Sequence, residues 1–490
     1  MSEDAIFIGG SGKDEELLLK LANRHGLVTG ATGTGKTVTL QILAEGFSQA
    51  GVPVFAADVK GDLSGIAQEG EMKDFLIKRA GKINFDDYGM DDFPVIFWDL
   101  FGKKGHPIRT TISEMGPLLL SRLMNLTEAQ EGALNIAFRI ADDEGLLLLD
   151  LKDLRSLLSD LADRGKEIAS DYGNVNKRTI GAIQRRLLVM EEQGAEEFFG
   201  EPALDIKDLM RTTRNGQGYI NILAADELMQ SPQLYATFLL WLLSELFEEL
   251  PEVGDPEKPK LVFFFDEAHL LFEDAPKGLV NTIEQVVRLI RSKGVGVYFV
   301  TQNPLDVPDE VLGQLGNRIQ HALRAFTPRD QKAVRAAAQT FRQNPGFDTE
   351  EAITQLGVGE ALVSTLDKKG SPTMVQRTLI RPPSSRMGPA DDSVRKKMQQ
   401  DSPVYGMYDD PIDRESAYEV LEKRAEQRAK SEAAEAKAKE EEKAAKKSSS
   451  GRRGYQRQTA TERFIKSMAS SVGRQLGRRL IRGILGSLLR

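Results

Sequence analysis

Short apolar runs of strand type alternate with helical patterns along roughly the first 380 residues. The strand-like runs lie at residues 26–29, 53–58, 95–100, 219–223, 261–266, 295–301 and 319–324. Several are apolar at every position rather than at alternate ones, which is typical of strands covered on both faces. A closing hairpin is predicted from residues 361–366 and 373–380. The pattern therefore predicts an α/β core with a mainly parallel sheet.

The strand-like runs stop between about residues 115 and 215, where apolar residues recur every three or four positions. Leu118, Leu119 and Leu123 begin this pattern, which we interpret as an all-helical insertion in the core. The predicted segments are a first core part (1–114), the helical insertion (115–215), a second core part (216–385), a charged helical linker (386–450) and a basic amphipathic C-terminal helix (451–490).

The two C-terminal segments differ in charge pattern. Residues 411–447 are rich in Glu, Lys and Ala, with opposite charges four positions apart, which predicts a solvated helix. Residues 451–490 carry ten Lys and Arg against Glu462 alone. Glycines interrupt the apolar stripe of residues 461–490, so we expect this stretch to order only against a partner surface. Packing on a subunit or partner ranks first, peripheral membrane contact second, and nucleic acid remains a further alternative.

Composition narrows the class of protein. The 490 residues are 40% hydrophobic and 28% charged, as in soluble globular proteins, and there is no cysteine for disulfides or thiol chemistry. No uninterrupted apolar stretch approaches the roughly 18 residues of a membrane-spanning helix, and we expect a cytoplasmic protein. The net charge of −8 disfavours nonspecific nucleic-acid binding by the outer surface but does not exclude a basic channel.

The strongest motif occupies residues 30–37, which read G-A-T-G-T-G-K-T and match G-x-x-x-x-G-K-[ST] between a predicted strand and a predicted helix. Such a loop binds the phosphates of ATP: its glycines let backbone N–H groups turn inward, its lysine reaches the outer phosphates, and its last hydroxyl is a ligand of Mg²⁺. The predicted nucleotide-binding residues are Gly30, Ala31, Thr32, Gly33, Thr34, Gly35, Lys36 and Thr37.

A second candidate group follows the apolar run 261–265, which ends in Asp266 and Glu267. A parallel strand would place both acids at the sheet edge that carries the phosphate-binding loop. Asp266 is then the predicted Mg²⁺ ligand, through water, and Glu267 the residue that orients the attacking water or accepts its proton. His269 nearby is interpreted as a packing or hydrogen-bonding residue.

The next apolar strand ends in a polar pair that includes Gln302. We predict that Gln302 senses the γ-phosphate or positions the water; the alternative is an amide that only caps the strand.

Together these elements resemble the HerA–FtsK superfamily of P-loop motors, and within it the bacterial HerA-like helicase proteins. The resemblance covers residues 5–385 and rests on the loop at 30–37, A-D-V-K-G-D-L-S at 57–64, F-D-E-A-H at 265–269 and V-T-Q-N-P at 300–304. It implies a RecA-like core, a homo-oligomeric ring that is commonly a hexamer, ATP hydrolysis at subunit interfaces, and translocation of a polymer through the pore.

Rings of this kind place an arginine of one subunit on the nucleotide of the next. The resemblance assigns this role to Arg318, with Arg288 and Arg291 as rivals and a plain surface cation as the alternative. The leading functional hypothesis is an ATPase that moves or remodels DNA. A protein-handling motor of the same architecture and a nucleotide-dependent switch or scaffold are the alternatives, and DNA-stimulated ATPase activity would separate the leading hypothesis from both.

Overall fold

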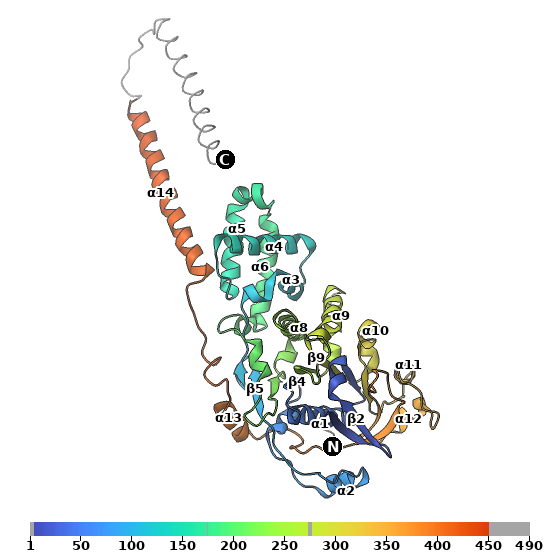
Figure 1. The fold of residues 1–490 in the computed structure, drawn as a ribbon. Coiled ribbons are helices and arrows are strands. Elements are labelled where there is room, and N and C mark those ends of the chain that lie inside the picture. Colours follow the sequence, from blue (N-terminus) through green and yellow to red (C-terminus); the bar gives the residue numbers. More distant parts are fainter. Residues whose placement is uncertain (1–3, 174, 273–276, 450–490) are drawn as a thin grey trace. The chain divides into compact units, whose positions relative to one another are not determined.

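A computed structural model describes residues 4–173, 175–272 and 277–449 of the chain, which forms two units, residues 1–421 and 422–490. The first unit is built on one sheet with helices on both faces (Figure 1). Its strand order is β2-β1-β12-β11-β10-β3-β9-β8-β4-β7-β5-β6. The pairs from β10 to β6 are parallel and the four pairs from β2 to β10 are antiparallel, which confirms the predicted α/β fold.

The strands begin and end close to the predicted apolar runs. They are β1 (Ala5–Gly10), β2 (Asp14–Leu18), β3 (Gly26–Thr29), β4 (Val54–Asp58), β5 (Val95–Asp99), β6 (His106–Pro107), β7 (Ile220–Ala224), β8 (Leu261–Phe265), β9 (Val295–Thr301), β10 (Asn317–Gln320), β11 (Glu360–Ser364) and β12 (Gln376–Ile380). The hairpin β1–β2, which extends the antiparallel end of the sheet, was not predicted, because Asp14–Leu18 is half polar and pairs only as an edge strand.

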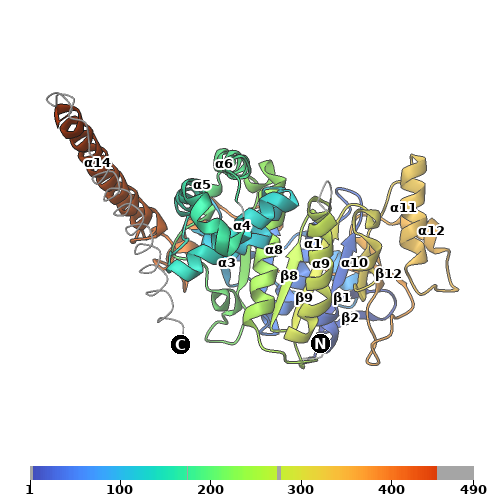
Figure 2. The same ribbon diagram turned by 90° about the horizontal axis from the view of Figure 1, so that it is seen from above.

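Helices cover the two faces of the sheet in separate layers. They are α1 (Lys36–Gln49), α2 (Asp74–Lys82), α3 (Ile112–Leu123), α4 (Glu128–Glu144), α5 (Leu151–Tyr172), α6 (Lys177–Glu192), α7 (Ala195–Phe198), α8 (Pro232–Glu249), α9 (Lys277–Ile290), α10 (Asp309–Leu312), α11 (Pro328–Gln339), α12 (Thr349–Gln355), α13 (Asp392–Gln400) and α14 (Ala417–Ser449). Figure 2 shows α3–α6 gathered at one end of the sheet and α11 and α12 at the other.

Alternation along the central strands divides the interior into two cores. In β8, Phe263 and Phe265 pack with α8 and α9, whereas Val262 and Phe264 face the opposite side, where α1 packs. Because both faces are covered, these strands are apolar at every position, as the sequence indicates. The carboxyl ends of the central parallel strands carry the candidate site.

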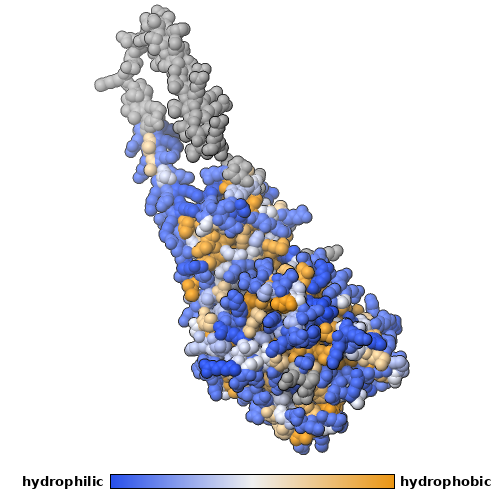
Figure 3. Space-filling model, viewed as in Figure 1, coloured by the Kyte–Doolittle hydropathy of each residue, from blue (hydrophilic) through white to orange (hydrophobic). Residues whose placement is uncertain are grey.

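The region predicted as a helical insertion is helical from Ile112 to Phe198, with α3 to α7 in sequence. Its apolar residues join the same core as α8 and one face of the sheet. The visible surface is mostly hydrophilic, with apolar side chains gathered over this helical region (Figure 3). Exposed apolar residues there are Leu118, Leu147, Leu188 and Val189. The division into segments remains a prediction.

The chain continues to pack on the first unit beyond the predicted end of the core. Val404, Tyr408, Ala417 and Leu421 are buried, and the Arg109 guanidinium donates to the Tyr408 carbonyl at 2.8 Å. Beyond Leu421 the side chains of α14 that the structure describes are almost all exposed, as expected of a solvated helix. The predicted C-terminal helix 461–490 lies outside the described residues. Among the described helices, none combines the length and apolarity that crossing a bilayer requires.

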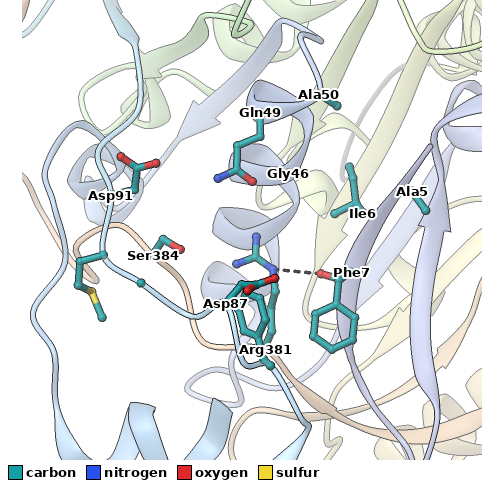
Figure 4. A pocket seen from close by; sticks show the side chains of 13 residues that line it. Ala5, Ile6, Phe7, Gly46, Gln49, Ala50, Asp87, Asp91, Arg381 and Ser384 are labelled. Carbon is teal, nitrogen blue, oxygen red and sulfur yellow. Dashed lines mark hydrogen bonds between the residues drawn. The ribbon is translucent and has the colours of Figure 1, made fainter. Parts of the chain in front are cut away.

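A buried ion pair joins the end of the core to α1. Arg381 Nη1 lies 3.1 Å from Glu45 Oε2, and Nη2 donates to the Ile42 carbonyl. Figure 4 shows the hydrogen bond from Arg381 to the Phe7 carbonyl. Glu45 also accepts from the backbone of Ser384 and Ser385. One wall of a neighbouring pocket is formed by Arg381. This network ties α1, β1 and the segment after β12 together.

Candidate functional site

The predicted phosphate-binding loop connects β3 to α1. Gly30 packs so closely against His321 that an added Cβ would lie 2.5 Å from the His321 Cβ. Gly35 has φ 116°, in the left-handed region that residues other than glycine rarely adopt. Thr32, Gly33 and Thr37 are exposed. The loop is thus packed against His321 on one side and exposed to solvent on the other, where its ligand would lie.

Lys36 lies at the centre of this loop. Its side chain is buried, and the ammonium donates to the Gly30 carbonyl at 2.6 Å and to the Ala31 carbonyl at 3.3 Å. Burial lowers the pKa of Lys36, and the carboxylates of Glu267 and Asp266 act in the opposite direction. A lysine held within an open loop and facing two acids fits the predicted role on the outer phosphates.

The order β3-β9-β8-β4 brings the ends of four parallel strands to one edge of the sheet. Thr29 at the end of β3 pairs with Thr301 at the end of β9, so the phosphate-binding loop and Gln302 follow neighbouring strands at the same edge of the sheet. Asp266 and Glu267 follow β8, and Asp58 ends β4. Four separate stretches of sequence therefore converge on one site.

Asp266 lies in a small pocket beside the loop. The residues that line this pocket are Thr37, Leu40, Ala57, Asp58, Lys60, Asp62, Leu63 and Asp266. Burial, together with the adjacent carboxylate of Glu267, raises the pKa of Asp266 to about 7. Among the described residues, no three His, Cys, Asp or Glu side chains are grouped to hold a metal alone. A carboxylate beside a hydroxyl suits Mg²⁺, which keeps waters and phosphate oxygens as its other ligands.

Glu267 is buried on a strained backbone. Its φ of 48° and ψ of 47° are left-handed, an uncommon conformation for a residue with a side chain. Lys60 Nζ lies 2.7 Å from Oε1, and the Gln302 amide donates to Oε2 at 3.4 Å. His269 Nδ1 lies 3.5 Å from Oε2. Burial opposes ionisation and is the largest single effect, but Lys60, Gln302 and His269 together outweigh it, so the pKa of Glu267 is lowered.

Gln302 connects the acid to the loop. Besides its bond to Glu267, its carbonyl oxygen accepts from the Thr32 hydroxyl at 3.5 Å. The side chain thus lies between the loop and the residue predicted to handle the water. This placement is compatible with the predicted water-positioning role. An amide that only capped the strand would not need to contact both Glu267 and the loop.

Lys60 and Asp58 were not assigned roles from the sequence, although the segment 57–64 was singled out. Asp58 accepts hydrogen bonds from the backbone N–H groups of Gly61, Leu63 and Ser64, which shape the turn that carries Lys60. The signal was available: a charged residue directly after a buried parallel strand lies at the same sheet edge as Asp266.

His321, directly after β10, was likewise missed. Its Nδ1 donates to the Glu360 carbonyl at 2.9 Å, and its Nε2 accepts from the Thr39 hydroxyl at 2.8 Å. Burial lowers the pKa of His321 to about 4, so the ring is neutral. It supports the loop from below, against Gly30. A single His in the sequence carries no signal for such a role.

The candidate interface arginines lie elsewhere. The Arg318 guanidinium donates to the carbonyls of Leu315 and Leu312 at 3.1 and 2.9 Å, and it bonds to none of the predicted site residues among those described. Acting on a neighbouring subunit would require these bonds to break. Arg291 pairs with Asp255 at 3.2 Å. Arg288 is exposed, without a partner in the described part of the chain.

A parallel sheet with a glycine-rich phosphate loop after one strand and paired acids after another defines a P-loop NTPase. The sequence model of the family "Helicase HerA-like C-terminal" matches residues 5–490. The chain belongs to this family.

Two relatives are DNA double-strand break repair helicases named HerA. The protein of Saccharolobus solfataricus is 22% identical over 366 residues, which cover 72% of this chain and 64% of the relative. That of Sulfolobus acidocaldarius is 22% identical over 365 residues, covering 72% and 65%. The chain thus spans slightly less than two thirds of the length of these relatives.

Solved structures share the fold. The bacterial conjugative coupling protein TrwB, solved as TrwBdeltaN70, is similar with a TM-score of 0.51 and 15% identity, over 79% of this chain and 92% of the solved chain. VirB4 of Thermoanaerobacter pseudethanolicus is similar with a TM-score of 0.50 and 14% identity, over 80% and 98%. At such low identity the similarity describes the fold alone.

Proposed function

We propose that this chain hydrolyses ATP in a Mg²⁺-dependent reaction and uses the energy to move or remodel DNA as a ring-forming motor of the cytoplasm. The observation that carries the proposal is the convergence of Lys36, Asp266, Glu267 and Gln302 at one edge of the sheet. The loop residues bind the phosphates, while Glu267 and Gln302 handle the water. Retention of both residues favours hydrolysis over a nucleotide-dependent switch.

In this reaction the residues divide the work. Lys36 and the loop N–H groups hold the outer phosphates, and Gln302 orients the attacking water towards the γ-phosphate. Glu267 accepts the proton of that water at a carboxylate oxygen, while the bond from the γ-phosphorus to the bridging oxygen breaks and ADP leaves. Thr37 and Asp266 would hold Mg²⁺, which when bound neutralises charge on the phosphate oxygens. Lys60 must leave Oε1 of Glu267 before this oxygen can receive a proton.

DNA is the proposed substrate because the relatives named HerA are DNA repair helicases. The first test measures ATP turnover with single-stranded DNA, with double-stranded DNA and without DNA, together with the mass of the assembly. DNA-stimulated turnover in an oligomer is the expected result. Turnover that DNA leaves unchanged would favour the protein-handling motor, and a fully active monomer would remove the ring.

A subunit-mixing experiment tests the shared site. Arg318→Ala and Glu267→Gln subunits are each expected to be inactive in homogeneous assemblies. Mixed assemblies should recover part of the turnover, because some interfaces then pair an intact Arg318 with an intact Glu267. Absence of recovery in a mixture that demonstrably co-assembles would exclude Arg318; repeating the experiment with Arg288→Ala tests the exposed rival.

A further inference from the structure

Lys60 lines two adjoining cavities. One is the small pocket with Thr37 and Asp266 described above. The other is a larger cleft at the carboxyl ends of β4 and β7, closed on its far side by α13. Ligands of parallel α/β sheets bind in crevices at this end of the strands. Nothing in the proposed hydrolysis uses this second cleft.

The second cleft is basic, although the chain as a whole is acidic. Its charged lining residues are Asp58, Lys60, Lys103, Lys104, Asp226, Asp392, Arg395 and Lys396. Five of the eight are cations, and Asp58 is already occupied by three backbone N–H groups. A positive cleft on a chain of net charge −8 selects anions.

The cations differ in how firmly they are held. The Arg395 guanidinium lies 4.4 Å from the centre of the Phe97 ring and donates to the Lys104 carbonyl at 3.1 Å, which fixes its position. Lys103 and Lys104 form exposed pairs with Glu227 and Asp226, of a kind that contributes little energy and exchanges readily for another anion.

Two further cations, Lys396 and Lys60, also favour an anionic ligand. Lys396 is exposed and bonds to no other described residue. The ammonium of Lys60, about half exposed, holds Glu267 Oε1 at 2.7 Å. Several cations spread along one cleft match a chain of phosphates better than a single anion.

We propose that this basic cleft binds consecutive phosphate groups of a polyanion, and that the bound polyanion draws the Lys60 ammonium away from Glu267. One ammonium cannot hold Glu267 Oε1 and a phosphate in the cleft equally well. Release frees a carboxylate oxygen to act on water, so occupancy of the cleft raises hydrolysis. Lys60 is a positioning residue in this scheme, because it acts through Glu267. The coupling step rests on the proposed function, whereas the binding site does not.

Binding is tested on the full chain with a labelled single-stranded oligonucleotide and with inorganic polyphosphate, by fluorescence anisotropy and competition at several salt concentrations. We expect Lys396→Ala and Arg395→Gln each to weaken binding several-fold. Each should also lower the slope of log affinity against log salt by about 0.7, the value for one lost phosphate contact on a single strand. The matched control is Lys397→Ala, exposed on the same helix but outside the cleft.

Coupling is tested by turnover without and with the same two polyanions. Lys60→Met should raise the basal rate about tenfold, the scale of one charge-assisted hydrogen bond, and remove further stimulation. Lys60→Arg should restore both the low basal rate and the stimulation. A purely structural role would instead lower the rate of Lys60→Met, and Lys60→Arg would not restore stimulation.

The outcomes distinguish the identity of the polyanion, the binding site and its coupling to hydrolysis. Stimulation by the oligonucleotide alone identifies nucleic acid as the polyanion, and stimulation by both identifies any chain of phosphates. Unchanged affinity and salt slope in Lys396→Ala and Arg395→Gln would overturn the site. A wild-type basal rate with full stimulation in Lys60→Met would overturn the coupling. If wild-type protein turns over no ATP, the proposed function and its coupling fail, while anisotropy still decides on the cleft.

Discussion

Two buried glutamates occupy contrasting surroundings in the same domain. Glu45 on α1 pairs with Arg381 and also accepts from the backbone of Ser384 and Ser385 and the Ser385 hydroxyl. Glu267 after β8 has Lys60 on one oxygen and only the long contacts of Gln302 and His269 on the other. Glu45 is saturated, whereas Glu267 is incompletely satisfied.

The difference extends to the backbone and to solvent. Glu45 lies within a regular helix, and its partner Arg381 is itself buried. Glu267 has a left-handed backbone, and its partner Lys60 is about half exposed at the mouth of a cleft. Removing the cation of a saturated buried acid is costly to the fold, while a strained acid with exchangeable partners is available for chemistry. Two predictions test this contrast, and a third tests the histidine beneath the phosphate-binding loop.

The largest effect is expected at the saturated network. Arg381→Ala would leave Glu45 buried without its cation and should lower the free energy of unfolding by about 3–5 kcal/mol. Urea denaturation monitored by circular dichroism measures this loss. The control is Lys430→Ala, which removes an exposed helical pair with Glu426 and should change stability by at most about 0.5 kcal/mol. A loss below about 1 kcal/mol in Arg381→Ala would contradict the structural role.

At the other glutamate, activity should change far more than stability. Glu267→Gln keeps size and hydrogen bonding but cannot take a proton, so turnover should fall at least about a hundredfold while ATP binding persists. Turnover assays and fluorescent-nucleotide titration measure the two quantities. Glu257→Gln, at an exposed acid that pairs with Lys20, is the control and should turn over ATP as the wild type does. Turnover close to wild type in Glu267→Gln would remove its assigned role.

The smallest effect concerns the neutral histidine beneath the loop. The folded pKa of His321, about 4, is below the ordinary value of 6.5, so the unfolded chain takes up the proton first as the pH falls. The stability that this group contributes is complete above about pH 6.5 and is lost progressively towards pH 4. The loss amounts to about 2 kcal/mol at pH 5.

Denaturation of wild type and His321→Gln at pH 7.5 and pH 5 measures this term, since the variant should lose less stability between the two values. His25, also buried with its pKa lowered to about 4, contributes similarly in both proteins and so cancels from the comparison. An equal loss in both proteins would show that His321 does not titrate with folding.

Much of the fold and part of the site could be predicted from local pattern. The runs 26–29 and 295–301 coincide with β3 and β9, because a strand buried on both faces has to be apolar throughout. Asp14–Leu18 escaped prediction because its strand character comes from pairing with β1. The loop at 30–37 could be predicted because a phosphate-binding motif constrains consecutive residues. The roles of Lys60 and His321 depend instead on neighbours more than 200 residues away.

The sequence by itself therefore determined the α/β class, and it predicted the phosphate-binding loop and the acids after β8, since each depends on residues adjacent in the chain. Only the tertiary structure decided which polar groups share a site. The strand order β3-β9-β8-β4 places Gln302 between the loop and Glu267 and brings Lys60 against the same acid. The fold also places Arg318 where it donates hydrogen bonds to carbonyls of its own chain. Strand order is set by packing over the whole sheet, a long-range free energy that no local pattern records.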